Sequence, residues 1–112
     1  RLVGYYEGGS LACRMRTYWR AGAFNQDFWG YGCEDCDFYA RLASTSEWHE
    51  KRSIDFLHLY HGRVSGWDAH HKANKARDMQ LRSMTMGDRL SLQYKQLREK
   101  GYGELLEEAL RD

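Results

Sequence analysis

The chain has 112 residues, of which 42% are hydrophobic, 14% aromatic and 29% charged, a composition that fits one modest globular domain and excludes a disordered one. A formal net charge of +1 gives no general attraction to nucleic acid. No apolar run approaches the ~18 residues of a membrane span, and the odd number of cysteines, three, argues against a disulfide framework. A cytoplasmic location is the simpler expectation, with any membrane association supplied by other parts of a parent protein.

The sequence of the first third of the chain predicts two short strands and a helix. Residues 2–6 and 10–13 are short apolar runs on either side of Gly8 and Gly9, which predicts strands there. Residues 14–21 carry apolar side chains at helical spacing and are followed by Gly22, a common helix stop. A loop then leads to a helix predicted to start at Glu34, because acidic residues are favoured at the first turn of a helix.

The sequence of the rest of the chain predicts one more strand, followed by helices. Residues 54–60 alternate as a strand does and end at His61. Beyond Asp68 the spacing turns helical, with one apolar stripe formed by Met79, Met86, Leu90, Tyr94 and Leu97, and a short last helix is expected over residues 104–111. The predicted class is therefore α/β, with a few short strands plus helices and a helical C-terminal tail. We expect residues 1–66 to form one region and residues 67–112 a helical extension packed on it.

The run WGYGCEDCD, from Trp29 to Asp37, is the strongest candidate for a site. It places glycines that allow close backbone approach next to aromatic faces and to three acids in four positions. The repulsion among these acids is costly unless a cation, a hydroxyl-rich ligand or a proton relieves it. Helix capping is the alternative explanation of the acids.

Two interpretations of the cysteines, acids and histidines compete. In the first interpretation, the spacing of Cys33 and Cys36 and that of His58 and His61 offer four zinc ligands. The protein would then be a non-enzymatic module, either stabilised by zinc or binding carbohydrate or protein. The acids between the cysteines and the short gap between the histidines argue against zinc. In the second interpretation, the acids, an oxygen-preferring divalent cation and a sugar form a catalytic site, in which one carboxylate takes a proton from the attacking hydroxyl.

The second interpretation coincides with a resemblance. Residues 8–42, reading GGSLACRMRTYWRAGAFNQDFWGYGCEDCDFYARL, are similar to the C-terminal galactosyltransferase-like domain of GT-A type nucleotide-sugar glycosyltransferases, such as β-1,4-galactosyltransferases, polypeptide N-acetylgalactosaminyltransferases and chondroitin-type polymerases. The later run LHLYHGR resembles the strand on which this family presents a metal-binding histidine. The resemblance implies the C-terminal part of a GT-A fold and a metal-dependent inverting transfer from a nucleotide-sugar donor, a UDP-sugar, to a saccharide or other hydroxyl acceptor.

The resemblance also implies roles for individual residues. Asp35 would be the general base, and Glu34 would bind sugar hydroxyls. Trp29 and Gly30 are expected to bind substrate, and Tyr31 stands where galactosyltransferases have a Trp that stacks on the acceptor. The same resemblance places Gly8 and Gly9 beside the donor sugar and makes His61 a ligand of Mn²⁺ or Mg²⁺.

The family pattern is incomplete in these residues. Cys33 and Cys36 replace a glycine and an acid of the galactosyltransferase form. The nucleotide-binding half with its Asp-x-Asp metal motif is expected to precede this region in the parent chain, so these residues by themselves are expected to be catalytically incomplete.

Overall fold

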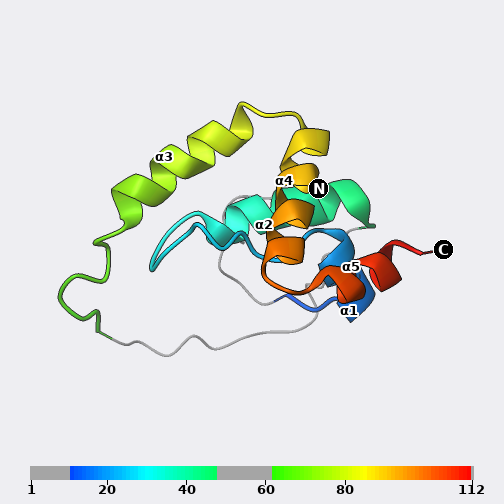
Figure 1. Cartoon of the computed structure of the whole chain (residues 1–112). Helices are drawn as coiled ribbons and strands as arrows, with labels where there is room; N and C mark the ends of the chain where they lie inside the picture. Colours follow the sequence, from blue (N-terminus) through cyan, green and yellow to red (C-terminus); the bar gives the residue numbers. More distant parts are fainter. Residues whose placement is uncertain (1–10, 48–61, 112) are drawn as a thin grey trace.

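The computed structural model describes residues 11–47 and 62–111, and this part of the chain folds as five α-helices (Figure 1). In chain order they are α1 (Met15–Arg20), α2 (Glu34–Thr45), α3 (His71–Arg82), α4 (Met86–Glu99) and α5 (Gly103–Leu110). In Figure 1, α3 reaches outward from the group formed by the other four helices. No helix in these two ranges is long and apolar enough to cross a membrane.

The predicted α/β class, with the short strands of a GT-A fold, is wrong for the described residues, where every regular element is a helix. Residues 11–13, expected to end a strand, have no regular secondary structure, and both Leu11 and Cys13 are exposed. A three-residue apolar run cannot form a strand without a neighbouring strand to share its hydrogen bonds. The other predicted strands, over residues 2–6 and 54–60, lie outside the described residues.

Helices α1, α2, α4 and α5 pack around two connected groups of buried side chains. The first is formed by α2 and the end of α1, and the second joins α4 and α5 to the segment after α1. Tyr18 of α1 contacts both groups, and its ring lies 5.1 Å from that of Trp19 and 5.5 Å from that of Phe38. The buried residues are Ala21, Phe38, Tyr39 and Leu42 in the first group and Ala23, Leu97 and Leu106 in the second.

The turn after α1 is held by polar side chains from two other helices. The guanidinium of Arg41 on α2 donates hydrogen bonds to the carbonyl oxygens of Ala21 and Ala23, the latter at 2.6 Å. Gln93 on α4 donates to the carbonyl oxygen of Gly22 at 3.2 Å. Gly22 has φ +84°, and a Cβ there would lie 2.5 Å from the Cβ of Gln93. Glycine is therefore required at this position by both backbone angle and space.

Most helices begin and end close to the predicted positions, but the helical stripe beyond Asp68 is not continuous. Residues Ser83 to Thr85 separate α3 from α4. The Thr85 side chain accepts a hydrogen bond from the backbone N–H of Asp88 and caps α4. Met79, predicted to lie on the apolar stripe, is 71% exposed, because it belongs to the separate helix α3. The division at residue 66 stays a prediction, although contacts join residues on either side of it.

Candidate functional site

The loop that enters α2 is fixed by one buried side chain of α3. Asn74 accepts a hydrogen bond from the backbone N–H of Trp29 at 3.2 Å and donates to the carbonyl oxygens of Trp29 and Tyr31 at 2.7 and 2.9 Å. The side chain of Asn74 uses both its amide oxygen and its amide nitrogen on this loop, and the residue is 2% exposed. Helix α3 therefore sets the backbone path of the predicted aromatic-glycine motif.

The two glycines of this loop lie against the start of α3. Gly30 has φ +62°, and a Cβ there would meet the ring of His70 at 3.4 Å. Gly32 has φ +117°, and its Cβ would lie 2.9 Å from the Cδ2 atom of His71. A side chain at Gly32 would have to displace the His71 ring. These glycines let the loop backbone pack closely against the start of α3, and the approach of a ligand to them stays a prediction.

The first turn of α2 carries the two predicted acids. Cys33 precedes the helix with φ +70°, and Asp35 accepts a hydrogen bond from the backbone N–H of Cys36 at 2.8 Å through Oδ1. Glu34 is half-buried, and its Oε2 atom is buried with no hydrogen-bond partner in the described part of the chain. A buried carboxylate oxygen without a donor is the group that a ligand hydroxyl would satisfy.

Asp37, the third acid of the motif, faces the protein interior and is 1% exposed. Its two carboxylate oxygens accept hydrogen bonds from Arg41 of the same helix and from Arg89 of α4, each at 2.8 Å. Burial lowers the pKa of Arg41, and the Asp37 carboxylate opposes that shift. Two arginines, and not a ligand, thus relieve the charge of Asp37, so only Glu34 and Asp35 of the three acids remain candidates for the site.

Aromatic side chains gather beside this turn. Trp29 is 67% exposed and Tyr31 is 47% exposed. The Tyr31 ring makes edge-to-face contacts with Trp67 at 4.7 Å and with His71 at 5.2 Å between centroids. The guanidinium of Arg63 lies over the Trp67 ring at 3.8 Å. Tyr31 is therefore part of a larger aromatic group that the sequence interpretation did not include.

Asn74, Trp67, His71 and Arg63 are the residues that sequence reasoning missed. Trp67 offered a signal, because a tryptophan next to Gly66 in a short polar segment is unusual for a turn. Asn74 offered none, because a single asparagine in a polar helix looks like a solvent-exposed residue.

The described residues include the three cysteines but not the predicted metal ligand His61. Cys13, Cys33 and Cys36 are free thiols. Burial, followed by the charge of Asp78, raises the pKa of Cys33, which favours its neutral form. Among the described residues no group of three His, Cys, Asp or Glu side chains is placed to hold a metal ion. The predicted ligand His61, like Gly8 and Gly9, lies outside them.

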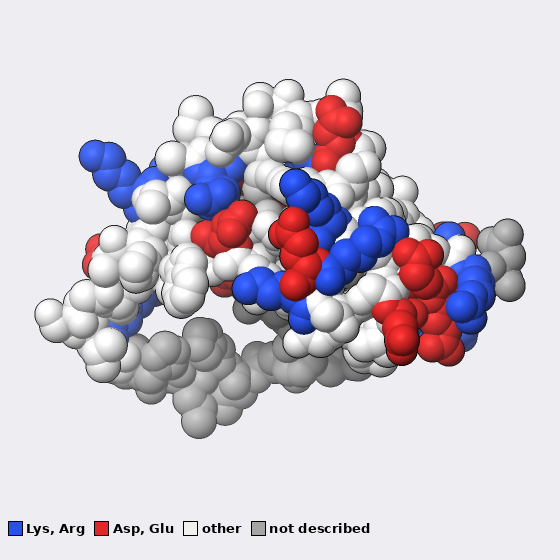
Figure 2. All heavy atoms as spheres, viewed as in Figure 1, with Lys and Arg blue, Asp and Glu red and all other residues white. Residues whose placement is uncertain are grey.

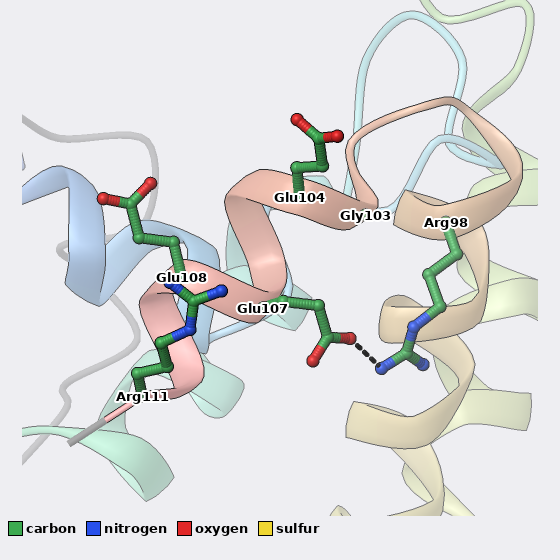
Figure 3. Close-up of a pocket in the computed structure, with 6 residues that line it drawn as sticks. All are labelled: Arg98, Gly103, Glu104, Glu107, Glu108 and Arg111. Atoms are coloured by element: carbon green, nitrogen blue, oxygen red, sulfur yellow. Dashed lines mark hydrogen bonds and ion pairs between the residues drawn. The ribbon is translucent and has the colours of Figure 1, made fainter.

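A concave region lies away from this loop, between the last turn of α4 and α5 (Figure 3). Its lining is charged, and Arg98 and Glu107 form an ion pair there at 2.9 Å. Figure 2 shows the acidic side chains gathered over this end of the molecule beside basic ones. The lining residues are Arg98, Gly103, Glu104, Glu107, Glu108 and Arg111, and none belongs to the motif around Asp35.

A loop with exposed aromatic rings next to half-buried carboxylates is an arrangement suited to binding and activating a sugar hydroxyl. One comparison identifies a family: a family model described as the N-terminal domain of galactosyltransferase matches residues 4–62, more than half of the chain. The chain belongs to this galactosyltransferase family, and membership implies a glycosyltransferase enzyme. Searches of curated proteins and of solved structures found no match.

Proposed function

We propose that this chain is the acceptor-side portion of a metal-dependent, inverting glycosyltransferase that moves a sugar from a nucleotide-sugar donor, a UDP-sugar, to a saccharide acceptor. The observation that carries the proposal is the placement of Glu34 and Asp35 in the first turn of α2, directly after the loop that Asn74 holds. The family match favours a transferase over a non-enzymatic zinc or carbohydrate-binding module.

In the proposed reaction, Asp35 takes the proton from the acceptor hydroxyl while the acceptor oxygen attacks the anomeric carbon of the donor. The new bond joins oxygen to that carbon, the bond from the carbon to the nucleoside diphosphate breaks, and a single displacement inverts the anomeric configuration. The hydrogen bond from the Cys36 N–H to Asp35 holds the carboxylate in one orientation. The buried Oε2 of Glu34 would accept a hydroxyl of the sugar.

The loop residues would bind the acceptor ring. The exposed ring of Tyr31 offers a flat apolar face for the C–H side of a pyranose, and Trp29 adds a second exposed face. The edge contacts of Trp67 and His71 restrict the Tyr31 ring before any ligand binds, which lowers the entropy cost of binding.

The described residues alone do not supply a full set of metal ligands. We therefore propose His61 as one ligand of Mn²⁺ or Mg²⁺, with the others from outside the described residues. Such a cation would neutralise the negative charge of the departing nucleoside diphosphate.

The test is Asp35→Asn in the protein that also carries the nucleotide-binding half. We expect transfer to fall by at least about a hundredfold, the lower bound for loss of a general base, with no change in thermal unfolding. The matched control is Asp88→Asn, the same change in the first turn of α4, which should leave turnover unaltered. Normal turnover by the Asp35 variant would remove the assignment of the base.

A further inference from the structure

Arg63 lies beside Tyr31, in the proposed acceptor site. Its guanidinium carbon lies 3.8 Å from the centroid of the Trp67 ring and 5.6 Å from that of Tyr31. Trp67 in turn contacts Tyr31 edge to face at 4.7 Å. A guanidinium stacked on an aromatic face loses little hydrogen-bonding capacity, because its N–H donors lie in its own plane and point past the edge of the ring.

The charge of Arg63 has no acidic partner within residues 11–47 and 62–111. Arg77 there pairs with Asp27, Arg82 with Asp78, and Arg98 with Glu107, whereas Arg63 shares the lack of an acidic partner in these ranges with other exposed arginines such as Arg14 and Arg111. The basic character continues into α3, whose Lys72 and Lys75 are exposed, while the nearest acid in sequence, Asp68, makes no ion pair with Arg63. In Figure 2, basic side chains stand out from the end of the molecule where α3 lies.

We propose that Arg63 binds a carboxylate on the acceptor, so that the acceptor is an acidic saccharide of the uronic acid type. This inference rests on the proposed function, because it places the sugar ring on Tyr31. The planar fork of a guanidinium matches the two oxygens of a carboxylate in a bidentate contact. Glu34 and Asp35 would repel an anionic group placed against them, which favours the orientation that turns the carboxylate toward Arg63.

The test uses two saccharides that differ at one group, methyl β-glucuronide with a carboxylate at C6 and methyl β-glucoside with a hydroxymethyl there. Each is titrated into the isotope-labelled chain, and binding is followed by amide and indole NMR shifts. We expect the glucuronide to bind at least about tenfold more tightly, as one charge-assisted hydrogen-bonded contact allows. The largest shifts should fall at Tyr31 and Trp67.

Two variants separate a specific contact from general attraction. Arg63→Gln should bring the ratio of the two affinities to about one, whereas Lys75→Gln, a matched loss of one exposed positive charge on α3, should leave the preference in place. A preference that survives in Arg63→Gln, or equal binding of both sugars by the unaltered chain, would overturn the inference while leaving the acceptor site standing. Failure of both sugars to shift Tyr31 would count against the proposed acceptor site as well.

Discussion

Asp37 on α2 accepts a hydrogen bond from Arg89 on α4 at 2.8 Å between Oδ1 and Nη2, and the two side chains are 1% and 8% exposed. The two residues are 52 positions apart in the chain. This buried pair, completed by Arg41, ties the helix that carries the candidate site to the C-terminal helices. Because the Asp37 carboxylate is the shared partner of two buried arginines, the stability of the fold depends on its charge.

Asp37→Asn should therefore destabilise the protein strongly. The amide keeps the size of the side chain but removes the charge that two buried guanidinium groups require, a loss of about 3 to 5 kcal/mol for a buried pair. Chemical denaturation of the variant and of the unaltered chain measures the free energy of unfolding. Asp35→Asn is the control two positions away, and it should change that free energy by less than about 1 kcal/mol. Equal stability losses in the two variants would contradict the distinct roles assigned to these acids.

Asn74→Ala should release the loop that carries the aromatic rings. It removes three hydrogen bonds to the backbone of Trp29 and Tyr31, which we expect to cost about 2 to 3 kcal/mol. Hydrogen exchange at the Trp29 amide should become faster, and in the active parent protein the KM for acceptor should rise more than kcat falls. Lys75→Ala, on the exposed side of the same helix, is the control. Unchanged exchange at Trp29 would show that α3 does not hold the loop.

Gly22→Ala should be among the most damaging small substitutions. The backbone at φ +84° is unfavourable for alanine, and its Cβ would overlap the Cβ of Gln93 at 2.5 Å, so we expect a loss of about 3 kcal/mol or more. Gly101→Ala provides the comparison, because φ is +91° there and no atom lies within 4 Å of the added Cβ. The difference in melting temperature between the two variants isolates the contact with Gln93. Two equal melting temperatures would refute it.

Tyr94 should contribute to loss of stability at alkaline pH. Its hydroxyl donates a hydrogen bond to the carbonyl oxygen of Arg20 at 2.6 Å, and burial raises its pKa although nearby arginines oppose the shift. The folded protein thus holds this proton more tightly than the unfolded chain. The contribution is complete below the ordinary tyrosine pKa of about 10 and is lost as pH rises through the higher folded value.

Tyr94→Phe separates these effects. At neutral pH the variant should be less stable by about 1 kcal/mol through the lost hydrogen bond, and its stability should fall less steeply above about pH 10 than that of the unaltered chain. Denaturation across that range measures both, with Tyr102→Phe, at an exposed position, as the control. A variant curve parallel to that of the unaltered chain would exclude the alkaline role of Tyr94.

Local sequence signals were sufficient for several helix boundaries. The acids at Glu34 and Asp35 mark the start of α2 because they are favoured at a helix N-terminus, and Gly22 marks the end of α1 because it has a positive φ. Both signals act within a few residues and need no tertiary partner. The predicted apolar stripe was wrong only at Met79, which is exposed on α3, whereas Leu97 on α4 is buried in the core and Tyr94 packs against it.

The parts that sequence reasoning could not reach depend on distant partners. Nothing near Asp37 indicates that its charge is matched by Arg89, and nothing near Trp29 indicates that Asn74 of another helix binds its backbone. The strand predicted over residues 10–13 depended on a neighbouring strand that a short apolar run cannot specify. The roles of Asp35, Glu34, Trp29, Gly30 and Tyr31 remain predictions, as do those of Gly8, Gly9 and His61.

The hydrogen bonds that Asn74, Arg89 and Gln93 send to the first half of the chain have a practical consequence for protein engineering. In an excised fragment that stops at residue 62, where the family match ends, Asp37 would lose its hydrogen bond from Arg89, and the loop around Trp29 would lose its hydrogen bonds with Asn74. Grafting this half onto a related transferase would therefore require helices α3 and α4 to be transferred together with it.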